Sequence, residues 1–152
     1  MKSASAELGY MSLKEKQLEV VTSFLSGRDV FAALPTGYGK SLCYGCLPLA
    51  RDKLLGTQGS IVLVVSPLIA LMKDQVQSFR KRGVSAAYVT SDGDVECEDM
   101  KAGILEGKYQ LVFISPEQLI NNRRFRCMCQ SEHYQDKLIA LVVDEAHCVK
   151  KW

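Results

Sequence analysis

Five apolar runs rich in β-branched residues recur along the chain, and polar stretches separate them. The runs are almost continuously hydrophobic, without regular alternation of polar positions, which is typical of strands covered on both faces in a parallel sheet. The pattern therefore predicts five buried strands, over residues 29–33, 61–65, 86–89, 111–114 and 138–143.

Between these runs, the hydrophobic positions recur with the spacing of an amphipathic helix. This helical pattern covers residues 14–25, 41–54, 68–82 and 96–106. Because strands and helices alternate along the chain, we expect an α/β fold in which helices flank a mostly parallel sheet.

The composition is that of one ordinary globular domain, since 47% of the 152 residues are hydrophobic and 24% are charged. It excludes a disordered or collagen-like chain. No apolar run approaches the ~20 residues of a membrane-spanning helix, and the first residues lack the apolar stretch of a signal peptide. We therefore expect an intracellular protein with no membrane partner. The net charge of +2 is too small to identify a nucleic-acid partner.

The six cysteines indicate reduced thiols, because a chain this long and apolar does not need disulfide staples. Cys43 and Cys46 have CxxC spacing but lie in a helical pattern, which favours core packing over a redox or metal role. Cys127, Cys129 and His133 lack a fourth nearby ligand, whereas structural zinc almost always takes four. We expect no structural zinc in this chain.

A loop suited to binding phosphate follows the first predicted strand, over residues 34–41. Gly37 and Gly39 allow the backbone to bend with its N–H groups turned inward, and the start of a helix adds partial positive charge there. Lys40 can then reach the β- and γ-phosphates of a nucleotide, and the Ser41 hydroxyl can bind Mg²⁺. Leu34 replaces the first glycine of the general motif, so the motif alone is only moderately specific.

An acidic pair, Asp144 and Glu145, directly follows the last predicted strand. Ligands of α/β sheets bind beyond the carboxyl ends of the strands, so this pair is suitably placed for a metal-bound phosphate. Asp144 would hold Mg²⁺, and Glu145 would orient and deprotonate an attacking water. Taken alone, the pair is also compatible with a simple strand end. Together with the phosphate loop it predicts hydrolytic phosphoryl transfer.

These motifs resemble the RecQ group of superfamily 2 DNA helicases, and the loop is most similar to the Werner-type branch. The similarity rests on residues 35–44, residues 144–148 and Trp152. It implies a RecA-like domain, ATP hydrolysis with Mg²⁺, 3′-to-5′ unwinding, binding of single-stranded and duplex DNA, and a nuclear role in DNA repair and recombination. It also implies a catalytic role for His147, a DNA contact at Trp152, and nucleotide contacts that include Thr36, Gly37, Tyr38 and Gly39.

The resemblance extends upstream to a segment that reads adenine in this family. Tyr10 lies where the family stacks an aromatic ring on the base, and Lys14 replaces the usual arginine. Gln17 is retained, and its amide can donate to one edge nitrogen of adenine while accepting from the amino group. The alternative is that Gln17 is an ordinary exposed helix residue.

Two further stretches resemble helicase motifs Ia and Ib, residues 66–76 and 115–119. In each, a Ser-Pro pair directly follows a strand and would place a hydroxyl and free N–H groups at a helix start, which suits sequence-independent contact with phosphates. The alternative is an ordinary helix cap. The basic segment 121–126 is interpreted as a solvated loop. The resemblance assigns DNA contacts to Ser66, Pro67, Leu68, Lys73, Ser115, Pro116 and Glu117.

The resemblance also predicts how the chain is divided and where it ends. Residues 1–27 would form an N-terminal segment with the adenine-reading motif, and residues 28–152 a partial RecA-like domain that stops before the motif III strand. Because that strand lies between the strands at 29–33 and 138–143 in this superfamily, we expect either a gap there or a distorted site. The oligomeric state stays open.

Two other functional classes are considered beside a helicase. Another P-loop NTPase, such as a transporter or small-molecule kinase, would need a signature loop or an acceptor site, and the sequence contains neither. A non-catalytic nucleotide-binding module is the second alternative, but the intact Lys40, Asp144 and Glu145 argue against it.

Overall fold

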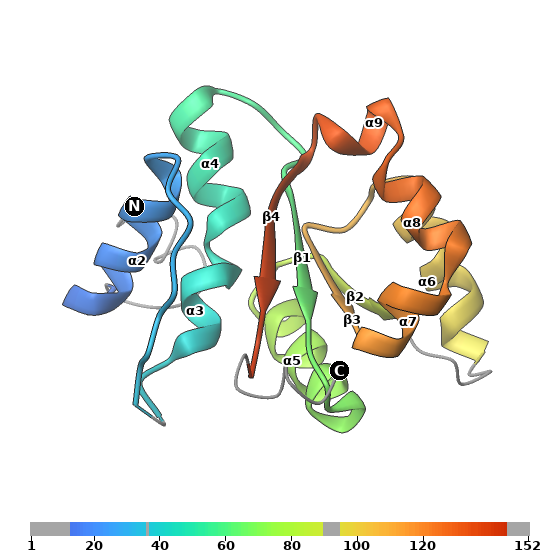
Figure 1. The fold of residues 1–152 in the computed structure, drawn as a ribbon, viewed down its shortest axis with the longest axis horizontal. Coiled ribbons are helices and arrows are strands. Elements are labelled where there is room, and N and C mark those ends of the chain that lie inside the picture. The colour runs from blue at the N-terminus through green and yellow to red at the C-terminus, as the bar shows by residue number, and fades with distance from the viewer. Residues whose placement is uncertain (1–12, 36, 90–94, 146–152) are drawn as a thin grey trace.

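The computed structural model describes residues 13–35, 37–89 and 95–145, which form a parallel sheet flanked by helices (Figure 1). Helices α2, α3 and α4 lie on one side of the sheet, and α6, α7 and α8 lie on the other. In chain order the elements are α2 (Glu15–Leu25), α3 (Lys40–Gly45), α4 (Leu47–Leu55), β1 (Ile61–Val65), α5 (Ile69–Lys81), β2 (Ala86–Val89), α6 (Val95–Leu105), β3 (Leu111–Ile114), α7 (Pro116–Asn121), α8 (Arg123–Cys129), α9 (Glu132–Gln135) and β4 (Leu138–Val143).

The sheet has the strand order β2-β3-β1-β4, and every pairing is parallel. Val64 of β1 lies opposite Phe113 of β3 on one side and Val142 of β4 on the other. All four carboxyl ends therefore meet at the same edge of the sheet. The α/β class and the parallel sheet predicted from the continuous apolar runs are confirmed.

The core is built on β1, β2 and β3, whose residues are all buried. Three aromatic rings join this sheet to the helices on one face: Tyr44 of α3, Phe79 of α5 and Phe113 of β3, with centroids 6.1 to 6.4 Å apart. Gly45 permits this packing, because a Cβ at that position would collide with the Phe79 ring. The helix that follows the phosphate loop is thereby held against the sheet.

The helical pattern at 41–54 forms two helices, because Pro48 interrupts it. Proline has no N–H to donate to the carbonyl of Tyr44, so α3 ends at Gly45 and α4 begins at Leu47. Cys43 and Cys46 are buried in this region, which confirms the prediction that they pack in the core. Burial raises the pKa of the Cys46 thiol to about 12, so it is not a reactive thiolate.

The segment 121–126 is not the solvated loop that its charge predicted. It contains the end of α7 and the beginning of α8. Asn122 caps α8 by accepting a hydrogen bond from the backbone N–H of Phe125 at 3.0 Å, and the Phe125 ring is buried. The buried ring anchors the segment, while the arginines beside it are exposed.

The predicted strand at 29–33 is not formed. These residues belong to no helix or strand, and they run between α2 and the phosphate loop with the Phe31 side chain 85% exposed (Figure 1). A strand is stabilised by backbone partners on a neighbour, and none of the described strands pairs with this segment. The β-propensity of residues 29–33 is therefore not sufficient to predict a strand.

Strand β4 consequently lies at the edge of the described sheet, with β1 as its only described partner. Its outer side is open, since Leu141 is 59% exposed and Val143 is 38% exposed. Residues 29–33 do not pair with β4 in the described sheet.

Within the described ranges, no helix is both long and apolar enough to cross a membrane. Across the same residues, no three His, Cys, Asp or Glu side chains come together as a metal-binding group. Cys127 is exposed and Cys129 is partly buried, and both are free thiols.

Candidate nucleotide-binding site

The phosphate loop forms a tight turn that leads directly into α3. Both of its described glycines have left-handed backbones, with φ of 81° at Gly37 and 89° at Gly39, which side chains with a Cβ rarely adopt. The N–H of Tyr38 donates to the carbonyl of Pro35 at 3.1 Å and closes the turn. The predicted role of both glycines in bending the loop agrees with this geometry.

Helix α3 presents two polar side chains at its start, beside the loop. Lys40 is its first residue and is exposed, and Ser41 follows it partly buried. The next residues, Leu42 to Gly45, are all buried. The helix start therefore combines a buried base with an exposed lysine, an arrangement typical of phosphate-binding loops.

The acidic pair lies beyond the carboxyl end of β4. The backbone N–H of Asp144 donates to the carbonyl of Val65 at 2.9 Å, so pairing with β1 continues past the strand end. The Asp144 carboxylate accepts a hydrogen bond from the N–H of Glu145 at 3.0 Å. Glu145 itself has a φ of 56°, an unfavourable conformation for a residue with a side chain. Such strain clusters at functional sites.

Lys40 and Asp144 interact electrostatically although they come from opposite ends of the chain. Burial raises the pKa of the Asp144 carboxyl above its ordinary value, and the charge of Glu145 adds to this rise. The hydrogen bond from Glu145 N–H and the positive charge of Lys40 oppose it. The positive charge of Lys40 therefore acts on Asp144, but it compensates only part of the effect that burial has on the pKa of this carboxylate.

We expect Asp144→Asn to raise thermal stability at neutral pH. A raised pKa means that the folded chain binds the proton of the Asp144 carboxyl more tightly than the unfolded chain does. Proton binding therefore stabilises the fold fully at pH values below the ordinary carboxyl pKa, and this stabilisation is lost as the pH rises through the pKa of the folded chain. At pH 7 the negative charge of Asp144 destabilises the folded chain, and asparagine removes this charge. The melting temperature should rise by about 1 to 4 °C at pH 7.

The matched control for this measurement is Asp136→Asn, an exposed aspartate after α9. Scanning calorimetry should find no comparable gain for the control, and the gain for Asp144→Asn should vanish near pH 3, where the wild-type carboxyl is protonated in both states. A loss of stability for Asp144→Asn at pH 7 would contradict the expected destabilising charge.

The α2 side of the site places Lys14 and Gln17 against the phosphate loop. The Gln17 amide donates to the carbonyls of Tyr38 and Gly39 at 2.9 and 3.0 Å, and its oxygen accepts from the N–H of Lys14 at 2.8 Å. The Lys14 ammonium lies 4.7 Å from the centroid of the Tyr38 ring. Gln17 is only 2% exposed. The alternative of an ordinary exposed helix residue is wrong for Gln17.

The motif Ia and motif Ib regions differ in structure. Ser115 stands at the start of α7 as predicted, and it makes the ordinary helix cap that was considered as the alternative, with its hydroxyl accepting from the N–H of Gln118 at 3.3 Å and Pro116 in the first turn. Ser66 does not cap a helix, because α5 begins only at Ile69. The predicted position of Ser66 at a helix start and the alternative of a helix cap are therefore both wrong, and Leu68 stands at the cap position with its side chain 56% exposed.

Ser66 also does not present its hydroxyl to solvent. The side chain is 2% exposed, and its oxygen has no hydrogen-bond partner among the described residues. Its backbone N–H donates to the carbonyl of Ile114 at 3.0 Å. In this conformation the hydroxyl and N–H of Ser66 are therefore not available to a nucleic-acid phosphate.

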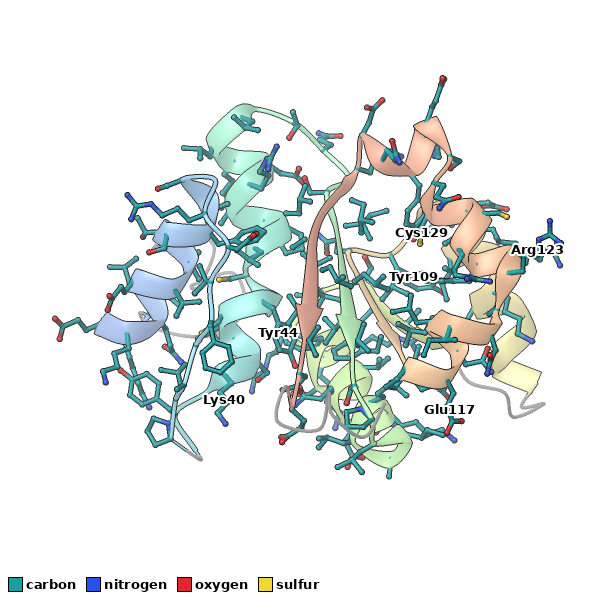
Figure 2. The ribbon with its side chains drawn as sticks, in the orientation of Figure 1. Lys40, Tyr44, Tyr109, Glu117, Arg123 and Cys129 are labelled. Carbon is teal, nitrogen blue, oxygen red and sulfur yellow. The ribbon has the colours of Figure 1, made fainter. Side chains whose placement is uncertain are left out.

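The other predicted nucleic-acid contacts lie near the carboxyl edge of the sheet. Pro67 is partly exposed, and Glu117 on α7 is exposed low in the view, as Lys40 is, but on the opposite side of the sheet (Figure 2). The Lys73 ammonium lies 5.8 Å from the centroid of the Tyr88 ring. The predicted contacts at Tyr10, Thr36, His147 and Trp152 lie outside the described residues.

Tyr44 is a member of this neighbourhood that the motifs did not single out. Its side chain is 5% exposed, and its hydroxyl has no partner among the described residues. Burial raises the pKa of this hydroxyl, and the nearby negative charge of Asp144 raises it further. In the sequence, Tyr44 ends the motif run 35–44 without an assigned role, and it lies one helical turn after Lys40.

Comparison with known proteins agrees with this geometry. The sequence profile described as DEAD/DEAH box helicase matches residues 14–152. Similar curated proteins include the ATP-dependent DNA helicase RecQ of Haemophilus influenzae, 35% identical over 95% of this chain, and that of Synechocystis, 38% identical over 95%. The ATP-dependent DNA helicase Q-like 2 of Arabidopsis thaliana is 32% identical over 95%. The chain covers 22%, 28% and 20% of these three proteins, respectively.

A solved structure supports the fold independently. The crystal structure of a hypothetical ATP-dependent RNA helicase from Sulfolobus tokodaii superimposes with a TM-score of 0.67 and 19% identity, and it covers 99% of this chain and 42% of that one. The fold is thus that of a RecA-like helicase domain. This chain belongs to the DEAD/DEAH box helicase family, and its curated relatives include RecQ helicases.

Proposed function

We propose that this chain is the ATP-binding part of a RecQ-type DNA helicase that couples ATP hydrolysis to 3′-to-5′ movement along single-stranded DNA and to unwinding of duplex DNA. One observation carries the proposal: a left-handed glycine turn leads directly into α3 with Lys40 at its start, and the acidic pair lies beyond the carboxyl end of β4. A nucleotide bound to the loop would have its terminal phosphates between these groups. The names of the relatives, ATP-dependent DNA helicases, support the same activity.

The residues fit ATP with Mg²⁺. Ser41 and Asp144 offer hydroxyl and carboxylate oxygens, which are the ligands that Mg²⁺ prefers, and the raised pKa of Asp144 indicates a carboxylate that a cation would stabilise. The bound metal would supply charge neutralisation at the phosphates. Lys40 would bind the β- and γ-phosphates, and the glycine turn would turn its N–H groups toward them.

Glu145 would orient the attacking water and accept its proton. Its backbone N–H donates to the Asp144 carboxylate, so the two acidic residues stay side by side. His147 would join the catalytic set by resemblance to the family. Motifs Ia and Ib, with Trp152, would contact the DNA backbone, and the intracellular site of action would be the nucleus.

The test is ATP turnover by the full-length protein with and without single-stranded DNA. We expect DNA to stimulate turnover severalfold, and a duplex with a 3′ single-stranded tail to be unwound in preference to one with a 5′ tail. Turnover that DNA does not change would indicate another P-loop NTPase. ATP binding without turnover in either condition would indicate a non-catalytic nucleotide-binding module.

A further inference from the structure

Helix α8 carries a cluster of positive charge that the nucleotide site does not use. Arg123, Arg124 and Arg126 all lie on this helix, and all three side chains are exposed. Residues 118–131 contain no aspartate or glutamate. Within the described ranges, none of the three guanidinium groups makes an ion pair or a hydrogen bond. The described protein therefore leaves these charges without a nearby counter-charge.

A small pocket lies beside the cluster, between α6 and α8, with a volume of about 70 Å³. Phe125 is 5% exposed, whereas Leu105 is 38% exposed and Arg124 is exposed, so the pocket has a buried base and is open to solvent. Its lining combines apolar and positively charged side chains, which include Val89, Ile104, Leu105 and Phe125 on the apolar side and Lys101 and Arg124 on the charged side.

The three arginines do not all face this pocket. Successive residues of an α-helix are rotated by about 100°, so Arg124 and Arg126 project in nearly opposite directions around the axis of α8. Arg124 lines the pocket, and Arg123 projects between the other two. Arg126 therefore lies on the far flank of the helix. The charge that a ligand in the pocket can reach comes from Arg123 and Arg124.

The size and the lining of the pocket limit what it can bind. Cofactors and drug-sized ligands need pockets of about 300 to 1,000 Å³, so this pocket is too small for them. Bound single-stranded nucleic acid stacks its bases on exposed aromatic rings, but the ring in this lining, Phe125, is buried. An aliphatic side chain suits the apolar walls, and a carboxylate suits the guanidinium group beside them.

We propose that the pocket between α6 and α8 is a docking site for an acidic peptide segment of a partner protein. One aliphatic side chain of the segment enters the pocket, and neighbouring carboxylates pair with Arg123 and Arg124. Charge complementarity selects this occupant, since arginine clusters recognise acidic motifs. The inference goes beyond the proposed function, because α8 and the phosphate loop lie on opposite sides of the sheet (Figure 1). Figure 2 shows Arg123 at the outer side of the molecule, away from Lys40.

The first test measures fluorescence anisotropy of a short synthetic peptide, with one leucine among aspartates and glutamates, as the full-length protein is added. The double variant Arg123→Ala, Arg124→Ala should bind this peptide about tenfold more weakly, because charge-assisted bonds are lost. Alanine favours the helix, so α8 should remain folded. The matched control is Arg126→Ala on the far flank of the same helix, and it should bind nearly like wild type.

Equal weakening by Arg126→Ala would show attraction to the overall charge and would overturn the docking site. Unchanged binding by the double variant would also overturn it. If the double variant instead loses affinity for a single-stranded oligothymidylate and keeps its affinity for the peptide, the arginines serve a nucleic-acid backbone and the proposal is wrong.

The apolar half of the site has its own test. Leu105→Gln should weaken binding of the same peptide about threefold, because it removes part of the apolar wall. The matched control is Leu54→Gln, an exposed leucine of α4 that is 66% exposed, and it should bind like wild type. A peptide with serine in place of its leucine should bind wild type more weakly. Equal binding of the two peptides would overturn the insertion of a side chain.

Hydrogen exchange locates the peptide without reference to ATP. Adding the acidic peptide to the wild-type protein should slow amide exchange in α8 and at the end of α6, while the amides of β1 exchange as before. Protection that falls elsewhere and spares α8 would overturn the proposal. Because neither measurement involves nucleotide, their failure would leave the proposed ATP-dependent activity unaffected, and loss of that activity would leave the docking site standing.

Discussion

Replacing Glu145 with glutamine is expected to lower ATP turnover by the full-length protein by about 10²- to 10⁴-fold, the usual contribution of a general base. Glutamine keeps the size of the side chain but cannot accept the proton of the attacking water. The backbone contact from the N–H of residue 145 to Asp144 does not involve the side chain, so the metal ligand should stay in place. Nucleotide affinity should therefore change little, and the loss should fall on turnover.

Single-turnover kinetics and equilibrium ATP binding, measured on the same protein, separate these two effects. The matched control is Glu132→Gln, which makes the same change on the exposed first turn of α9 and should retain wild-type turnover. Normal turnover of Glu145→Gln would exclude Glu145 as the base. A parallel loss of ATP affinity would show that Glu145 supports the binding site itself.

The sheet could be predicted because its signal is local and strong. Strands β1, β2 and β3 are buried throughout, and the continuous apolar runs that predict them are the direct consequence of cover on both faces. The same rule was less accurate at β4. Its continuous apolar run predicts a buried strand, although Leu141 and Val143 are substantially exposed. A hydrophobic residue is suited to burial, but the neighbouring elements determine whether it is buried.

The sequence predictions were wrong for segments whose structure depends on partners that are distant in the chain. The segment 29–33 has the composition of a strand, yet no described strand pairs with it. Ser66 and Ser115 stand in identical Ser-Pro pairs, but only Ser115 caps a helix, since the chain after Pro67 remains extended through Leu68 before α5 begins. No sequence signal distinguishes the two pairs.

The candidate site was predictable in its residue types and only partly in its contacts. The glycine spacing of the loop and the acidic pair after β4 follow from motif chemistry, and the charge of Lys40 acts on the pKa of Asp144 in the structure. The engagement of Gln17 with the loop was not predictable, because it needs the tertiary packing of α2 on α3. A glutamine has the same sequence signature whether its amide meets a base or a backbone carbonyl.

Lys40→Ala should weaken binding of ATP by about 10- to 100-fold, because a charge-assisted bond to phosphate contributes roughly 1.5 to 3 kcal/mol. Adenosine has no phosphate, so its affinity should not change. Lys81→Ala, an exposed lysine at the end of α5, is the matched control and should leave both affinities intact. Equal losses for ATP and adenosine would show that the substitution disrupts the loop as a whole and would remove the phosphate assignment.

The same variant tests the contact between the two halves of the site. The charge of Lys40 holds the pKa of Asp144 lower than burial alone would set it. Removing that charge should raise the pKa of Asp144 further, which NMR titration of the aspartate carboxyl carbons would detect in the nucleotide-free chain. A higher pKa together with selective loss of ATP binding would show that Lys40 serves the phosphates and the metal ligand from one position. An unchanged carboxyl pKa would mean that the phosphate loop and the acidic pair act as separate sites.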